Sequence, residues 1–199
     1  TIIMKEILKD APCLCKDDDM ERMQPKRNFF QKILYNRLRK RNCCYLYPVL
    51  YSDGIISNAI CDRIGRKPLG IIFENHLITL RDSSKRMNWY EAMDYCKSVK
   101  IFGQSCEAGT IEFWRKYLIE EESYFINKTL LSLEGKRLKP YEWYWSSSGC
   151  TAFFAWIFWT ANYNDMDTTN DKDDHFAVRP VLDFSKLPSE VITRFVWLT

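Results

Sequence analysis

The spacing of apolar residues changes along the chain, and these changes divide it into predicted strands and helices. Two short apolar runs, 69–73 and 76–80, are separated by Glu74 and Asn75, which is typical of a β-hairpin. Beyond residue 87 apolar residues recur every three or four positions, the spacing of a helix with one buried face. The pattern therefore predicts a hairpin followed by helices.

The two predicted helices begin at residues that can cap them. Asn88 is a suitable N-cap, and Glu91 lies three residues later, as a capping box requires. The apolar face of this first helix carries Trp89, Ala92, Met93, Cys96 and Val99. Thr110 can cap a second helix that ends at the acidic residues 120–122. Its apolar face carries Ile111, Trp114 and Leu118. Residues 123–142 are predicted to be irregular.

The later part of the chain is predicted to be β. Residues 151–159 (TAFFAWIFW) are nearly all apolar and too few for a buried helix, which predicts a central buried strand. Residues 161–174 are polar and predict a loop. Residues 176–184 predict a closing strand in which Pro180 marks an edge, a bulge or a strand end.

The first 50 residues are predicted to form a separate basic segment or arm. Residues 22–41 hold eight Lys or Arg and no acid, with apolar residues at near-helical spacing: Phe29, Phe30, Ile33, Leu34 and Leu38. Such a helix can contact a membrane or an acidic partner. The interpretation we favour is a solvated helix docked on the following domain by its apolar stripe.

Composition narrows the function classes. With 46% hydrophobic and 28% charged residues among 199, the chain can bury a core. The net charge of +3 gives no reason to expect a nucleic-acid partner. None of the eight cysteines forms a Cys-x-x-Cys pair, which argues against a zinc ribbon, and most are predicted to be buried or incidental thiols. The only histidines are His76 and His175, which limits histidine-based catalysis and metal binding.

Four short motifs then follow one another along residues 51–185. They are Asn88-Trp89-Tyr90-Glu91-Ala92 with Cys96, Thr110-Ile111-Glu112-Phe113-Trp114, Trp143-Tyr144-Trp145-Ser146-Ser147-Ser148 and Val178-Arg179-Pro180-Val181-Leu182. Their order and spacing resemble the C-type lectin fold, and more closely its bacterial and phage branch. That branch includes domains of bacterial surface proteins and hypervariable receptors diversified by retroelements.

This resemblance implies an α+β fold, C-type-lectin-like, in which two helices pack on short antiparallel sheets beside a long loop region. Residues 51–199 would be the ligand-binding domain. The Glu-Pro-Asn and Trp-Asn-Asp motifs of calcium-dependent sugar binding are absent. The loop after residue 160 would be the variable surface, because its small polar residues form hydrogen bonds adaptably. The predicted ligand-binding residues are Trp145, Ser146, Ser148, Tyr163, Asn164, Asp165, Asp167, Thr169, Asn170, Asp171 and Asp173.

The resulting hypothesis is a non-catalytic binding module for a protein or glycan ligand at a bacterial or phage surface. Cys15 and the Lys and Asp residues after it resemble the lipidated start of surface lipoproteins. The alternative is a structural or adhesin subunit of a larger assembly, which could be oligomeric and dock through residues 22–41. An enzyme is not expected, because serines 146–148 lack a Gly-x-Ser-x-Gly elbow and Cys150 has no nearby partner cysteine in the sequence.

No cofactor or metal is expected. The aspartates between residues 165 and 174 could bind calcium, but an EF-hand loop would need Gly at position 170 and Glu at position 176. The chain has Asn170 and Phe176 there. A solvated polar loop is the favoured interpretation.

Overall fold

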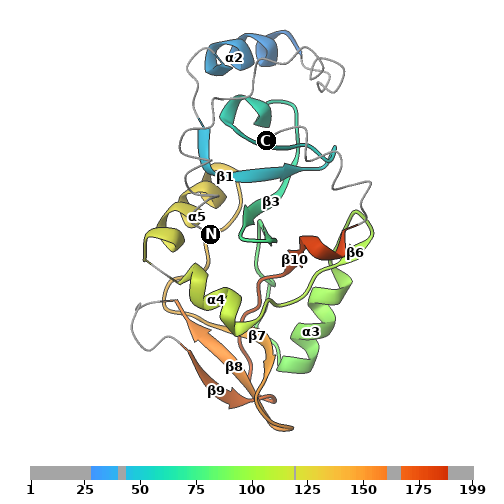
Figure 1. Cartoon of the computed structure of the whole chain (residues 1–199), viewed down its shortest axis with the longest axis vertical. Coiled ribbons are helices and arrows are strands. Elements are labelled where there is room, and N and C mark those ends of the chain that lie inside the picture. The colour runs from blue at the N-terminus through green and yellow to red at the C-terminus, as the bar shows by residue number, and fades with distance from the viewer. Residues whose placement is uncertain (1–27, 40–43, 119, 161–166, 188–199) are drawn as a thin grey trace. The chain divides into compact units, whose positions relative to one another are not determined.

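The computed structural model describes residues 28–39, 44–118, 120–160 and 167–187 (Figure 1). Helices and small antiparallel sheets make up this part of the chain, so the α+β class is confirmed. The chain divides into two compact units, Thr1–Glu74 with Pro188–Thr199, and Asn75–Leu187. Among the residues described, no helix has the length and apolar character needed to cross a membrane.

The first unit contains a helix and a small antiparallel sheet. Its elements are α2 (Phe29–Arg39), β1 (Cys44–Tyr51), β2 (Ile56–Ala59), the 3-10 helix η2 (Ile60–Arg63) and β3 (Pro68–Phe73). Strand β1 pairs with both β2 and β3, and Leu50 lies opposite Gly70 of β3. The predicted domain boundary between residues 50 and 51 therefore falls inside a paired strand. The compact units divide later, after Glu74.

The helix predicted within residues 22–41 is present as α2, but most of its apolar stripe faces solvent. Four of the five stripe residues are exposed: Phe29, Phe30, Ile33 and Leu34. The interpretation of a helix docked by this stripe is therefore wrong for these residues. Residues 22–27, 40 and 41 of the basic segment lie outside the described residues.

The second unit holds the remaining elements. They are β4 (His76–Thr79), α3 (Trp89–Ser98), β5 (Lys100–Ile101), β6 (Gln104–Ser105), α4 (Ile111–Tyr117), α5 (Glu120–Ser132), β7 (Trp143–Gly149), β8 (Phe154–Trp159), β9 (Asp167–Asp171), β10 (Val181–Asp183) and the 3-10 helix η3 (Phe184–Lys186). Strand β10 pairs antiparallel with β4. Strand β8 lies between β7 and β9 in a three-stranded antiparallel sheet, so its central position is confirmed.

Both predicted helix caps are confirmed. The Asn88 side chain accepts a hydrogen bond from Glu91 N at 2.9 Å, and the Glu91 carboxylate accepts one from Asn88 N at 3.3 Å. Thr110 Oγ1 accepts a hydrogen bond from Phe113 N at 3.2 Å. These bonds satisfy amide groups that the first turn of a helix leaves without partners.

Three sequence predictions in this unit are wrong in part. Residues 123–142 are not wholly irregular, because α5 continues to Ser132 and buries Ile126 and Leu130, one helical turn apart. The polar stretch 161–174 is not all loop, because β9 pairs with β8 along 167–171. The closing strand is confined to β10, which begins directly after Pro180.

The hydrophobic core of this unit joins α3 to the inner side of the three-stranded sheet. Ala92 and Cys96 of α3 are fully buried, together with Trp145 of β7 and Ala155 and Ile157 of β8. The indole of Trp145 donates a hydrogen bond to Met87 O at 2.9 Å, so its polar N–H is satisfied inside the core. The predicted buried face of the first helix is therefore confirmed at Ala92 and Cys96.

Four cysteines whose side chains the structure describes are free thiols. Cys61, Cys96 and Cys106 are buried, whereas Cys150 is exposed. Burial raises the pKa of Cys106 to about 11, so its thiol stays protonated and unreactive at neutral pH. The prediction of buried thiols is thus confirmed for three of the four.

A buried ion pair joins several segments of the second unit. Arg179 is 0% exposed, and its guanidinium donates hydrogen bonds to the Asp82 carboxylate, to Thr79 O at 2.7 Å and to Lys136 O at 2.7 Å. The other oxygen of Asp82 accepts a bond of 2.9 Å from the Tyr144 hydroxyl. Burial and the nearby Asp82 charge raise the pKa of Tyr144, so it acts here as a neutral donor.

We expect Asp82→Ala to lower the free energy of unfolding by about 3–5 kcal/mol, because it leaves the Arg179 charge buried without its counter-charge. Urea unfolding followed by circular dichroism measures this change. Asp94 provides the matched control, since its side chain is 81% exposed and pairs with Lys97 on the surface of α3. Asp94→Ala should change stability by less than about 0.5 kcal/mol. Equal stability of the two variants would show that the buried pair is not structurally important.

Candidate functional site

The register of β8 and β9 brings aromatic and polar side chains to one side of the sheet. Trp156 lies opposite Thr169, Phe154 opposite Asp171, and Phe158 opposite Asp167. Side chains at alternate positions of paired strands share a face. We call the open part of this side the β8–β9 face, and its residues are Phe154, Trp156, Asp167, Thr169 and Asp171.

The core covers the side of the sheet that faces away from the β8–β9 face. Helix α4 covers one end of the side that carries this face. Ala155 and Ile157 point into the core, and the Trp114 ring of α4 stacks on Phe158 with centroids 4.6 Å apart. The Phe154 end is open, since Phe154 is 43% exposed. The neighbouring Phe153 is 73% exposed. The inner side of the sheet is thus anchored in the core. The β8–β9 side presents aromatic rings to solvent at its Phe154 end.

Arg115 of α4 borders the β8–β9 face. Its Nε atom lies 3.0 Å from Asp167 Oδ2, and its guanidinium carbon lies 5.5 Å from the centroid of the Trp156 ring. The Arg115 side chain remains half-exposed. Arg115 therefore holds Asp167 in place at the edge of the face, and its guanidinium can still donate hydrogen bonds to a ligand.

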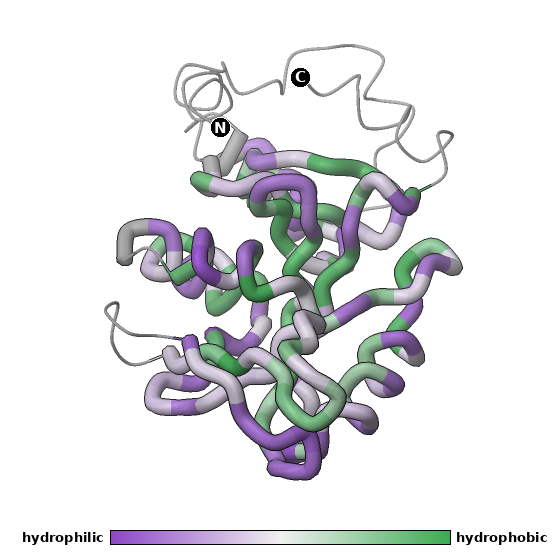
Figure 2. Tube along the Cα trace, turned by 60° about the horizontal axis from the view of Figure 1, so that its bottom comes forward, coloured by the Kyte–Doolittle hydropathy of each residue, from purple (hydrophilic) through white to green (hydrophobic). Residues whose placement is uncertain are grey.

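Lys172 holds the turn that carries Phe153. Its Nζ atom donates hydrogen bonds to Thr151 O at 2.9 Å and Ala152 O at 3.2 Å, and lies 4.5 Å from the ring centroid of Trp89. The Lys172 backbone N–H also donates to Phe153 O at 2.8 Å. A charged amine over an aromatic ring is stabilised by the ring quadrupole. Figure 2 shows hydrophilic residues at the bottom of the tube, where this part of the second unit lies.

Three of the predicted binding residues make contacts within the fold. Trp145, predicted at the surface, is fully buried, and this prediction is wrong because the ring completes the core beside α3. Ser146 is also buried, and its hydroxyl donates to Trp156 O at 2.9 Å. Ser148 Oγ accepts a bond of 3.1 Å from Ile111 N. The hydroxyls of these two serines therefore form hydrogen bonds with the backbone.

The other predicted residues divide by position. Asp167, Thr169 and Asp171 come together on the β8–β9 face. Asn170 points to the other side, opposite Ala155, and Asp173 lies in the turn after β9 with its backbone N–H bonded to Asp171 Oδ1 at 3.0 Å. Tyr163, Asn164 and Asp165 lie outside the described residues.

Sequence reasoning missed the aromatic half of this face and its arginine. The apolar composition of residues 151–159 predicts a buried strand, yet Phe153 and Phe154 are exposed. The alternation of smaller with larger side chains in Phe154-Ala155-Trp156-Ile157 could have indicated two different faces. No sequence signal placed Arg115 beside Asp167, since this pairing depends on how α4 packs.

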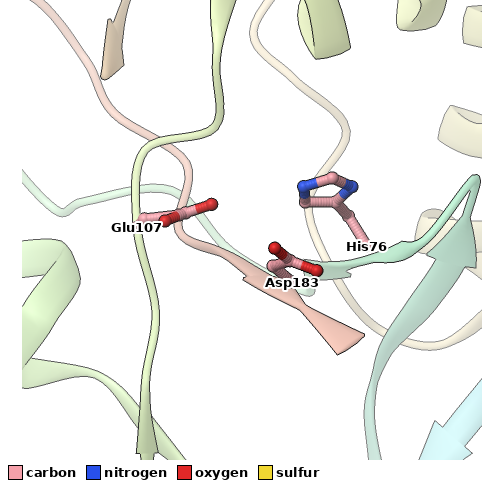
Figure 3. Close-up of side chains that lie close together, drawn as sticks. All are labelled: His76, Glu107 and Asp183. Atoms are coloured by element: carbon pink, nitrogen blue, oxygen red, sulfur yellow. The ribbon is translucent and has the colours of Figure 1, made fainter. Parts of the chain in front are cut away.

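A second group of functional side chains lies elsewhere in the same unit. One potential ligand atom each from His76, Glu107 and Asp183 lies within 4.8 Å of the other two (Figure 3). Sequence analysis gave no indication of this cluster, because the three residues are distant in the chain and form no spaced motif. Their side chains approach one another in Figure 3 from three separate segments.

The charges in this cluster influence one another. Burial lowers the pKa of His76, against the opposing effect of Asp183 and Glu107, so the neutral imidazole is favoured. Burial alone would raise the pKa of Asp183, but hydrogen bonds from Ser185 and the proximity of His76 hold it below its usual value. Lys186 forms an ion pair with Glu107 at the edge of the cluster. One neutral nitrogen donor thus lies beside two carboxylates.

Models of known protein families give no match to this chain, and curated proteins give none either. The geometry of the second unit therefore carries the functional argument.

We expect Lys172→Met to lower the free energy of unfolding by about 2 kcal/mol, because the turn at residues 151–153 loses two charge-assisted hydrogen bonds and the contact with Trp89. Urea unfolding followed by tryptophan fluorescence measures the loss. Lys97→Met is the control, since Lys97 is an exposed lysine of α3. If both variants are as stable as the unchanged protein, Lys172 does not hold the turn.

Proposed function

We propose that this chain is a non-catalytic ligand-binding module with a C-type-lectin-like scaffold, which recognises a protein or glycan ligand at a bacterial or phage surface. Binding occurs on the β8–β9 face and is extended by the segment that joins β8 to β9. The predicted residues Tyr163, Asn164 and Asp165 belong to that connecting segment.

The observation that carries this proposal is the combination of exposed aromatic rings with polar groups on an anchored sheet. Phe153 and Phe154 offer apolar area, while Asp167 and Thr169 offer hydrogen-bonding atoms beside them. Such mixed surfaces serve protein recognition and also suit the stacking of a sugar ring with bonds to its hydroxyls. Because the inner side of the sheet is packed in the core, little conformational entropy is lost on binding.

The arrangement of the second unit supports the lectin-like scaffold. Helices α3 and α4 start at the predicted caps, and the last strand β10 pairs with the early strand β4. A domain closed by strands from the two ends of its sequence can vary a surface segment without losing its core. Diversification of that segment by a retroelement stays a prediction.

A second candidate function is a structural or adhesin subunit, and one observation favours it. The apolar residues Phe29, Phe30, Ile33 and Leu34 of α2 are exposed, although they lie in a strongly basic stretch of sequence. Exposed apolar groups of this size commonly mark a contact with another protein. This candidate assigns binding to α2 instead of to the β8–β9 face.

Screening the purified chain against a glycan array and a displayed peptide library tests the proposal. We expect a specific ligand whose dissociation constant rises at least ~10-fold for Phe154→Ala, because truncating a central aromatic anchor typically costs more than 1 kcal/mol. Tyr141→Ala is the matched control, since Tyr141 is an exposed aromatic residue before β7. It should leave binding unchanged.

Two results would contradict the assignment of this face. One is a ligand whose affinity is the same for Phe154→Ala and the unchanged chain. The other is the absence of any glycan or peptide ligand together with self-association that is lost in Phe30→Ser, which would favour the structural subunit.

A further inference from the structure

The cluster of His76, Glu107 and Asp183 is separate from the residues that form the β8–β9 face. We propose that these three side chains bind a divalent first-row transition metal ion, with Zn²⁺ as the representative case. The site would supply one imidazole nitrogen and two carboxylate groups, and would leave coordination positions open for water or another ligand.

Backbone pairing on both sides of β10 brings the three residues together. Asp183 lies opposite His76 where β10 pairs with β4. Two residues earlier, Val181 exchanges both backbone hydrogen bonds with Glu107, each 2.8 Å long. Residues opposite one another, and alternate residues of one strand, direct their side chains to the same side of a sheet. The main chain itself therefore places all three donors on one side of β10.

The spacing of the donors suits a small metal ion. Zn²⁺ binds imidazole nitrogen and carboxylate oxygen at about 2.0–2.2 Å, so neighbouring donors in its shell lie about 3–3.5 Å apart. The potential ligand atoms of the cluster all lie within 4.8 Å of one another. Small side-chain rotations are therefore enough to close the site. This movement does not require the strands to separate.

The kind of donor selects the class of ion. Ca²⁺ prefers six to eight oxygen ligands, so an imidazole nitrogen is a poor ligand for it. First-row transition ions accept imidazole and carboxylate together. The two negative charges of Glu107 and Asp183 also balance a divalent cation, so the complex stays close to neutral in a half-buried position.

The state of His76 gives an independent reason to expect a ligand. Its Nδ1 atom is buried, and within the described part of the chain it has no hydrogen-bond partner. The Phe113 ring packs on the imidazole with centroids 4.6 Å apart and restrains its orientation. Burial also favours the neutral form, which is the form that binds metal. The imidazole is thus held beside two carboxylates, and its buried Nδ1 is not satisfied by any described group.

Lys186 is the competing cation at this site. Its ammonium pairs with Oε2 of Glu107, so Oε1 remains for the metal. The pair is half-exposed and therefore weak. A divalent ion with three ligands would displace Lys186 or share the carboxylate with it. Removing this lysine should consequently strengthen metal binding.

Isothermal titration calorimetry of the full chain with Zn²⁺ tests the proposal. We expect one saturable site whose dissociation constant rises at least ~10-fold in His76→Ala. His175→Ala is the matched control, because His175 is the only other histidine and is exposed in the turn after β9. It should bind like the unchanged chain. Lys186→Met should bind several-fold more tightly.

Co²⁺ titration distinguishes this site from the cysteines of the chain. Nitrogen and oxygen ligands give visible absorption bands without the near-ultraviolet charge-transfer band of a cobalt–thiolate bond. If His76→Ala fails to fold, Glu107→Gln is tested instead, because it keeps the shape of the side chain. Its Zn²⁺ affinity should fall by the same factor. The proposal is overturned by unchanged Zn²⁺ affinity in these variants, by thiolate bands alone, or by equally tight binding of Ca²⁺.

Discussion

The buried ion pair between Arg179 and Asp82 is the constraint on which the second unit depends. A guanidinium with no solvent exposure loses its hydration, and only a complete set of partners offsets that loss. Here the partners are the Asp82 carboxylate and two carbonyl groups, those of Thr79 and Lys136. Thr79 and Asp82 lie in one segment at and after the end of β4, and Lys136 lies after α5, so the arginine specifies how these two segments meet the chain before β10.

The segment around Arg179 connects both functional regions. On one side, Trp145 N donates to Ala177 O at 2.9 Å, which positions β7 and, through it, the β8–β9 face. On the other, the segment continues into β10, which pairs with His76 and borders Glu107. One stretch of main chain thus contacts both the sheet that carries the β8–β9 face and the cluster of His76, Glu107 and Asp183. The motif Val178-Arg179-Pro180-Val181 is a scaffold element and does not itself contact ligand in this account.

Local signals in the sequence predicted the local structure well. Features that depend on neighbours in the chain are confirmed. They are the caps at Asn88 and Thr110, the apolar face of α3, and the strands on either side of residues 74–75. Strand β10 begins only after Pro180, because proline has no amide hydrogen to donate to a neighbouring strand. Helix α5 was missed because its mixed composition carries only a weak apolar face.

The sites were harder to predict, because they depend on packing between distant segments. The assignment of Trp145 to the surface was wrong, since a tryptophan beside serines gives no sign of which side of its strand faces α3. Asp167, Thr169 and Asp171 were predicted to bind together, and strand pairing does place them on one face. The His76 cluster arises only from the register of β4, β10 and the chain at Glu107, and register cannot be read from spacing.

Sequencing this gene across a natural population of its source tests the central claim that a fixed scaffold carries a ligand-binding face on β8 and β9. The account predicts that substitutions concentrate at exposed positions of this face and in residues 161–166. Asp82, Tyr144 and Arg179 should remain unchanged, because their side chains form hydrogen bonds with one another in the buried network. Two results would contradict the claim of a fixed scaffold with a ligand-binding face. One is substitutions that are spread evenly over the surface, and the other is frequent replacement of Arg179 while the β8–β9 face stays constant.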